Sequence, residues 1–141
     1  MKRFWIIVLS VMALTSCHDQ VDQVSGSYSY KISGKAVIDG DTVVLSDETG
    51  AMEIVRLSAD STLLTFNALL GPAYTAKAKI EGKDIRIMPY ERTVNHQLKD
   101  YFITAQGIGT FYDKTIVVTL QYADTTADLK ADKLTMLCKK N

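Results

Sequence analysis

Apolar and polar residues alternate along most of this chain. The clearest stretch is residues 74–80 (YTAKAKI), where aromatic and aliphatic side chains share one face and threonine and lysines share the other. Alternation with a period of two predicts a half-buried β-strand. Similar β-prone runs recur, and the expected strands are residues 27–38, 42–46, 51–57, 61–66, 74–80, 85–88, 99–111, 115–122 and 133–139.

Short segments rich in turn residues separate these runs, among them DGD at 39–41, DETG at 47–50 and EGKD at 81–84. Parallel strands need a crossover of about a dozen residues, so these connections predict antiparallel, up-and-down order. About eight or nine such strands curl to protect their edges. We therefore expect an all-β fold closed as a barrel, or alternatively a β-sandwich. Gly107 and Gly109 fit a bend or bulge within one long strand.

The first residues have a different pattern. Lys2 and Arg3 precede residues 4–14 (FWIIVLSVMAL), which are apolar except for one serine. This run is about half the ~20 residues that a membrane-spanning helix needs. It is apolar all round, unlike an amphipathic helix of a globular protein, and the chain becomes polar at residues 18–20. A short apolar core behind two positive charges predicts an export signal.

The signal ends in Leu14-Thr15-Ser16-Cys17, which resembles the lipobox of bacterial lipoproteins. The resemblance implies that residues 1–16 are removed and that Cys17 carries fatty acyl chains such as palmitate. Two or more chains anchor a protein stably. We expect an exported protein held by membrane lipid at the cell envelope, at the outer membrane, with residues 17–25 as a polar tether and residues 26–141 as the β-domain.

Charge adds little to this picture. All 16 acidic residues but only 14 of the 16 basic ones follow residue 16, so the β-domain and tether carry a formal charge of −2. Both signs are interspersed, which excludes the basic footprint of a nucleic-acid-binding protein and a polybasic membrane patch. Cys138 has no partner once Cys17 is acylated. It alternates with Leu134 and Met136, which predicts a buried, inert thiol.

Familiar catalytic arrangements are missing from the sequence. There are two histidines, His18 and His96, and neither has another histidine at metal-ligand spacing. No G-x-S-x-G or similar context surrounds a nucleophile. The Gly-Ile-Gly run at 107–109 has strand-like flanks, whereas a phosphate cradle needs a following helix. We therefore expect no metal, no cofactor and no enzymatic activity, although a carboxylate pair of the glycosidase kind is invisible to sequence.

One candidate functional surface is the connection at residues 67–72 together with Tyr74. Leu69 and Leu70 lie in this connection, where apolar side chains are less expected. They fit a lid over a cavity or a partner contact, or they plug one end of the barrel as core. The pattern favours the plug.

The second candidate surface contains Tyr90 and Arg92. Pro89 is expected to end its strand there and to begin a long loop that reaches His96. Tyrosine with arginine suits a contact surface for a ligand or partner, and an ordinary solvated loop is the alternative.

The lipobox, the Gly26-Ser27-Tyr28 opening strand, the strand meander and the run GIGTFYDK at 107–114 together resemble the small calycin-like (lipocalin-like) lipoproteins of bacteria. The resemblance covers residues 26–139 and implies a lipocalin-like barrel. The Gly-x-Trp signature of true lipocalins is missing, since the only tryptophan, Trp5, lies in the signal.

Two functions remain open at this point. A barrel of about eight strands can hold one small ligand or can be filled by side chains. The first hypothesis is a lipid-anchored, non-catalytic binding module for a small, partly apolar ligand. The alternative is a structural or protein-interaction module of the envelope, with a filled barrel and a working outer surface.

Overall fold

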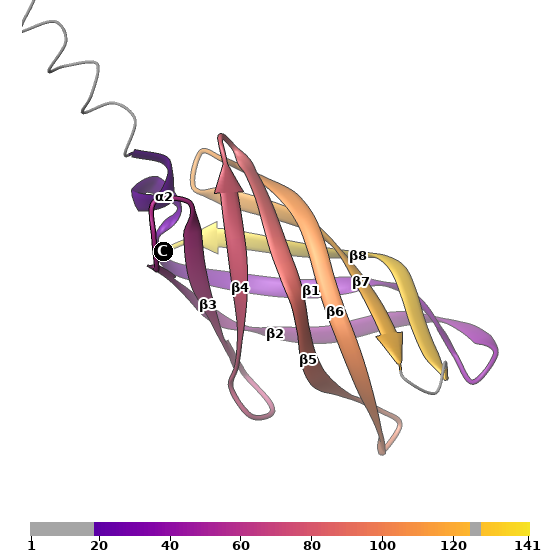
Figure 1. The fold of residues 1–141 in the computed structure, drawn as a ribbon. Coiled ribbons are helices and arrows are strands. Elements are labelled where there is room, and N and C mark those ends of the chain that lie inside the picture. The colour runs from indigo at the N-terminus through magenta and orange to yellow at the C-terminus, as the bar shows by residue number, and fades with distance from the viewer. Residues whose placement is uncertain (1–18, 125–127) are drawn as a thin grey trace, which may run out of the picture.

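The computed structural model describes residues 19–124 and 128–141. Cys17 and the expected signal therefore lie outside the described residues. Eight antiparallel strands follow one another around a closed barrel in the order of the sequence, which confirms the up-and-down meander (Figure 1). The strands are β1 (Gly26–Ile38), β2 (Asp41–Arg56), β3 (Ser61–Ala68), β4 (Tyr74–Glu81), β5 (Asp84–His96), β6 (Lys99–Tyr112), β7 (Thr115–Asp124) and β8 (Leu129–Lys140).

Turn chemistry explains this order. The hairpins β1–β2, β5–β6 and β6–β7 close through two residues each, Asp39–Gly40, Gln97–Leu98 and Asp113–Lys114. Every one of these residues has a positive φ, between 45° and 86°. Two positive φ values in a row belong to the type I′ turn, whose twist matches that of the flanking strands.

A short helix, α2 (Asp19–Val24), lies beside the barrel end that also holds the C-terminus (Figure 1). Val21 and Val24 are three positions apart, so they share one helix face, and both are buried in the core. The Tyr28 hydroxyl donates to the Val24 carbonyl oxygen at 2.6 Å. Part of the expected tether is therefore ordered against the barrel. Within the described residues, no helix is both long and apolar enough to span a membrane.

Two expected interruptions are not there. The turn expected at residues 47–50 is wrong, because β2 runs through it as one strand. The loop expected after Pro89 is also wrong, because β5 continues to His96. In both cases the chain absorbs an extra residue as a β-bulge, where the register of the ladder shifts.

The two glycines of β6 do not form the expected bulge, because the β6–β7 ladder keeps one register from Ile103↔Asp124 to Tyr112↔Thr115. Their role is close approach. A Cβ on Gly109 would lie 2.1 Å from the Val117 carbonyl oxygen.

Side chains fill the middle of the barrel. An internal cavity wide enough for water would leave exposed surface on the side chains that line it. Inward-facing side chains from three strands, β1, β3 and β8, are 0% exposed: Tyr28, Ile32, Phe66, Leu134 and Met136. Cys138 is buried among them, as predicted, and burial raises the pKa of its thiol to about 12.

Candidate functional site

A β-bulge in β2 turns two consecutive acids into the barrel. Ile32 pairs with Glu48 and Ser33 pairs with Ser46, so Asp47 is the extra residue between them. A bulge breaks the strict alternation of strand faces. The side chains of Asp47 and Glu48 are consequently only 3% and 4% exposed.

A second bulge, in β5, also changes which positions of its strand face into the barrel. Ile87 pairs with Gly107 and Tyr90 pairs with Ala105, so Met88 and Pro89 oppose a single residue of β6. Proline lacks the N–H of a regular ladder and is typical of bulges. The inward positions change from Ile85 and Ile87 before the bulge to Tyr90 and the residues that alternate with it beyond.

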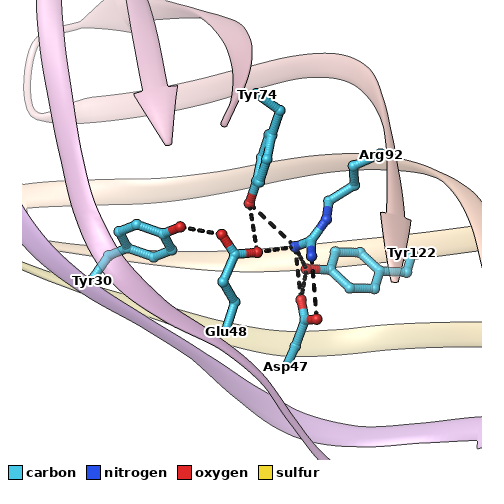
Figure 2. Close-up of polar contacts among 6 residues, drawn as sticks. All are labelled: Tyr30, Asp47, Glu48, Tyr74, Arg92 and Tyr122. Carbon is cyan, nitrogen blue, oxygen red and sulfur yellow. Dashed lines mark hydrogen bonds and ion pairs between the residues drawn. The ribbon is translucent and has the colours of Figure 1, made fainter. Parts of the chain in front are cut away.

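Arg92 is the centre of the site that these bulges build (Figure 2). Its Nη1 lies 2.8 Å from Asp47 Oδ2 and 2.7 Å from Glu48 Oε2. Its Nη2 donates to Asp47 Oδ1 at 3.3 Å, so the guanidinium grips Asp47 through both nitrogens. Such paired contacts are the strong form of a charge-assisted hydrogen bond.

Tyrosines complete the polar contacts. Tyr74 donates to Glu48 Oε2 at 3.0 Å, and Tyr122 donates to Asp47 Oδ2 at 2.6 Å. Tyr30 also donates to Glu48. The guanidinium carbon of Arg92 lies 4.8 Å from the ring centre of Tyr74, within cation–π range. We call Tyr30, Asp47, Glu48, Tyr74, Tyr90, Arg92 and Tyr122 the polar cluster.

An aromatic stack supports the cluster from the core side. The rings of Phe66 and Tyr74 stack with centroids 4.7 Å apart, and those of Tyr74 and Tyr90 lie 5.8 Å apart at 13°. The Tyr90 hydroxyl and Arg92 Nε are buried without a hydrogen-bond partner. Tyr90 is therefore held by ring packing rather than by its polar tip.

The electrostatics of the cluster favour a fixed network. Two carboxylates face one guanidinium, which leaves a formal charge of −1. Burial raises the pKa of Tyr74 and of Tyr90 well above the ordinary value, and it does the same for Tyr122. Burial disfavours the charged form of Arg92, but Tyr122, Tyr74 and the two carboxylates outweigh it, so its pKa is raised. The tyrosines stay neutral and Arg92 stays charged across physiological pH.

The structure unites three of the five residues that the sequence suggested for a ligand or partner surface. Tyr74, Tyr90 and Arg92 meet in the polar cluster, where Tyr90 and Arg92 point inward rather than forming a contact surface or a solvated loop. Leu69 and Leu70 do not join them. They are 78% and 90% exposed in the β3–β4 loop, so the interpretation of these leucines as a plug is wrong.

Sequence reasoning missed the partners of Arg92. The sequence pattern predicts a turn at Asp47 and Glu48, and it places Tyr30 and Tyr122 only in strands. A signal was present. In β2 the core-facing apolar residues change from odd positions, at Leu45, to even positions, at Met52 and Ile54. A change of parity within one strand is what a bulge produces.

The outer wall beside Asp47 and Glu48 has a small hollow of about 220 Å³. It lies over the β2 bulge and reaches the exposed leucine loop, and its lining includes Lys31, Asp47, Glu48, Leu69 and Leu70. Among the described residues, no group of three or more histidines, cysteines or acids could hold a metal ion.

Comparison with known proteins shows the fold alone. No family model matches the chain, and no curated protein matches it. A crystal structure of a Bacteroides ovatus protein of unknown function is similar, with a TM-score of 0.55 and 13% identity over 84% of this chain. The match covers 42% of that protein, so this chain spans less than half its length. A redesigned β-barrel has a TM-score of 0.49 and 10% identity, covering 86% of this chain and 94% of its own.

Proposed function

We propose that this protein is a lipid-anchored lipoprotein of the bacterial cell envelope whose β-domain is a non-catalytic interaction module. Membrane lipid is its partner through acylated Cys17, and other envelope components are its partners through the outer surface of the barrel. The observation that carries this proposal is the filled interior. A carrier of a small apolar ligand needs internal space, whereas core side chains such as Phe66, Leu134 and Met136 leave none between them.

The polar cluster supports a non-catalytic role. Catalytic acids and bases need a pKa near the working pH. The tyrosine pKa values of the cluster are instead shifted away from neutrality. The terminal guanidinium nitrogens of Arg92 pair with the two acids, and the side chains of all three residues are less than a tenth exposed. This arrangement holds two bulged strands together across the barrel.

The position of α2 supports the anchor. Cys17 precedes the helix by two residues in the sequence, and α2 packs on one barrel end through Val21 and Val24. Arg56 Nη1 holds Asp22 at 3.0 Å, and Lys140 Nζ donates to the Gln23 carbonyl oxygen at 2.8 Å. A lipid on Cys17 would therefore place this end next to the membrane and the other end away from it.

Metabolic labelling with a fatty acid tests the anchor. The wild type should take up label and sediment with membranes, while Cys17→Ser should take up none and release the domain. Cys138→Ala is the matched control and should label like the wild type, because its thiol is buried. Equal membrane attachment of the wild type and Cys17→Ser, with no label in either, would contradict the anchor.

Native mass spectrometry of the protein purified from cells tests the filled barrel. The expected result is the mass of the polypeptide with its acyl chains and nothing more. A co-purifying small molecule in stoichiometric amount would return the function to the ligand-binding hypothesis.

A further inference from the structure

The seam between β4 and β5 has the shortest ladder of the barrel. Only four residue pairs join these strands, from Glu81↔Asp84 to Ala78↔Ile87, whereas eleven join β5 to β6. Among the described residues, the β4–β5 ladder has no pair between 74–77 and 88–96. Figure 1 shows the two strands meeting at their turn and diverging toward the far end. The ladder stops where the Pro89 bulge begins.

The geometry of the β5–β6 hairpin identifies which backbone groups face this seam. Its two-residue turn is closed by His96 and Lys99, so these two form a hydrogen-bonded pair. Pairs alternate along an antiparallel ladder. Val94 and Arg92 therefore direct their N–H and C=O groups at β6. Thr93 and its neighbours two positions away, Glu91 and Asn95, direct theirs at the seam.

A side-chain contact independently indicates the same alternation of hydrogen-bonded and non-hydrogen-bonded pairs. Asn95 Nδ2 donates to Asp100 Oδ1 at 2.8 Å, across a pair of facing residues. Side chains approach most closely at pairs that do not exchange backbone hydrogen bonds. This agrees with Asn95 and Asp100 being a non-hydrogen-bonded pair, in which the backbone groups of Asn95 face away from β6.

The free edge is exposed and firmly held. The side chains of Glu91, Thr93 and Asn95 are exposed, while Tyr90 and Val94 are buried on the other face. Arg92 ties the same strand to β2 through Asp47 and Glu48. The edge is thus a fixed row of alternate donors and acceptors, which is a template for another strand.

We propose that the β5 edge, Glu91 to Asn95, binds an extended segment of a partner polypeptide by β-strand addition, with the added strand antiparallel to β5. Backbone groups of the partner would pair with those of the three edge residues, as in other strand-addition complexes. Leu70 and Leu98 are 90% and 99% exposed in the two connections that flank this end of the seam. They offer apolar contact to the side chains of the added strand.

The proposal rests on the proposed function in one respect, the exclusion of a second copy as the occupant. Two β5 edges paired antiparallel would point their α2 ends in opposite directions. Two copies anchored in one membrane through Cys17, two residues before α2, cannot meet in that way. A partner segment that reaches the free end of the barrel has no such constraint.

Thr93→Pro is the sharpest variant for a test. It removes the central edge N–H and spares the bonds to β6, because Thr93 donates nothing to that strand. Proline is tolerated at such edge positions. Thr93→Val is the matched control, because it keeps the N–H and a β-branched side chain of similar volume.

The experiment is amide hydrogen exchange by NMR on the ¹⁵N-labelled full-length chain in detergent micelles. The probe is a synthetic peptide with the sequence of residues 74–81, the strand that pairs with β5 elsewhere in the barrel. Without peptide, the amides of Thr93 and Asn95 should exchange at least tenfold faster than those of Arg92 and Val94. Saturating peptide should slow the Thr93 and Asn95 amides at least tenfold in the wild type and in Thr93→Val. Its affinity for Thr93→Pro should be at least tenfold weaker.

Three results would overturn the proposal. The first is protection of the Thr93 and Asn95 amides in the dilute free chain, because the edge would then be occupied already. The second is equal peptide binding by Thr93→Pro, or peptide that leaves these amides unprotected. The third is protection that grows with protein concentration alone, which would assign the edge to a second copy. The proposed function fails separately, by loss of fatty-acid labelling in cells.

Discussion

At the scale of single residues, Arg92 is the side chain on which the polar cluster depends. It is the only cation within hydrogen-bond distance of Asp47 and Glu48 in the described structure. A buried ion pair contributes little net stability when it is intact, because desolvation offsets the attraction. Removing one partner is costly, because it leaves an uncompensated buried charge. Loss of Arg92 leaves two such charges.

Arg92→Met should therefore lower the free energy of unfolding by about 3–5 kcal/mol. Arg56→Met is the control, because Arg56 pairs with Asp22 in solvent and such pairs contribute about 0–1 kcal/mol. Urea denaturation followed by far-UV circular dichroism measures both. Adding Asp47→Asn and Glu48→Gln to Arg92→Met should recover part of the loss. Equal losses for Arg92→Met and Arg56→Met would show that the cluster is not buried as described.

At the scale of strands, local pattern was a good guide wherever one register persists. Residues 74–80 alternate cleanly and form β4 almost as predicted. The turns at residues 39–41 and 81–84 are also predicted, because glycine and aspartate there suit tight hairpins. Such signals are local, so a single sequence is enough to detect them.

The two bulges could not be predicted because a bulge is defined by the pairing of two strands, and the sequence of one strand does not show that pairing. Asp47 resembles a turn residue in its own segment, and only the pairing of Ile32 with Glu48 shows that it is an inserted position. Pro89 resembles a strand end, and only β6 shows that the ladder resumes at Tyr90. The site depends on these shifts. Tyr74, Tyr90 and Arg92 could be proposed from sequence, but the fact that they meet could not.

The close approach of the neighbouring strands β6 and β7 gives a prediction at this scale. Gly109→Ala would place a Cβ 2.1 Å from the Val117 carbonyl oxygen and 2.7 Å from the Val118 Cα. Backbone atoms cannot yield as a flexible side chain can, so the strands must separate. Gly40→Ala meets nothing within 4 Å, and its positive φ costs only about 1–2 kcal/mol.

Thermal unfolding by circular dichroism should thus show a much larger fall in Tm for Gly109→Ala than for Gly40→Ala. Comparable falls would mean that β6 and β7 do not approach each other as closely as the structure has them.

At the scale of the whole molecule, the barrel has two unlike ends joined by a sealed core. One end is closed by α2, whose Val24 accepts the Tyr28 hydrogen bond. The other end carries exposed leucines and the β5 edge beyond the polar cluster. The proposed anchor and the proposed strand-binding edge therefore lie at opposite ends. A lipid would hold the module upright, and the edge would face away from the membrane.

The sealed core also predicts how stability depends on pH. Burial raises the pKa of Tyr28 from 10.0 to about 12 and that of Cys138 from 9.0 to about 12. Between about pH 9 and pH 12 the unfolded chain releases protons that the folded chain still holds. Unfolding is then favoured as pH rises, so this contribution is complete below pH 9 and is lost toward pH 12.

The urea concentration at the unfolding midpoint should consequently decrease as the pH is raised from 8 to 11. The other buried tyrosines should lower it in the same direction. Cys138→Ala removes one of the shifted groups, so its midpoint should fall less over the same interval, whatever its stability at pH 8. A midpoint that is unchanged or rises at pH 11 would mean that water reaches Tyr28 and Cys138. A barrel with that access would be hollow enough to admit a ligand, and the interaction-module proposal would lose its main support.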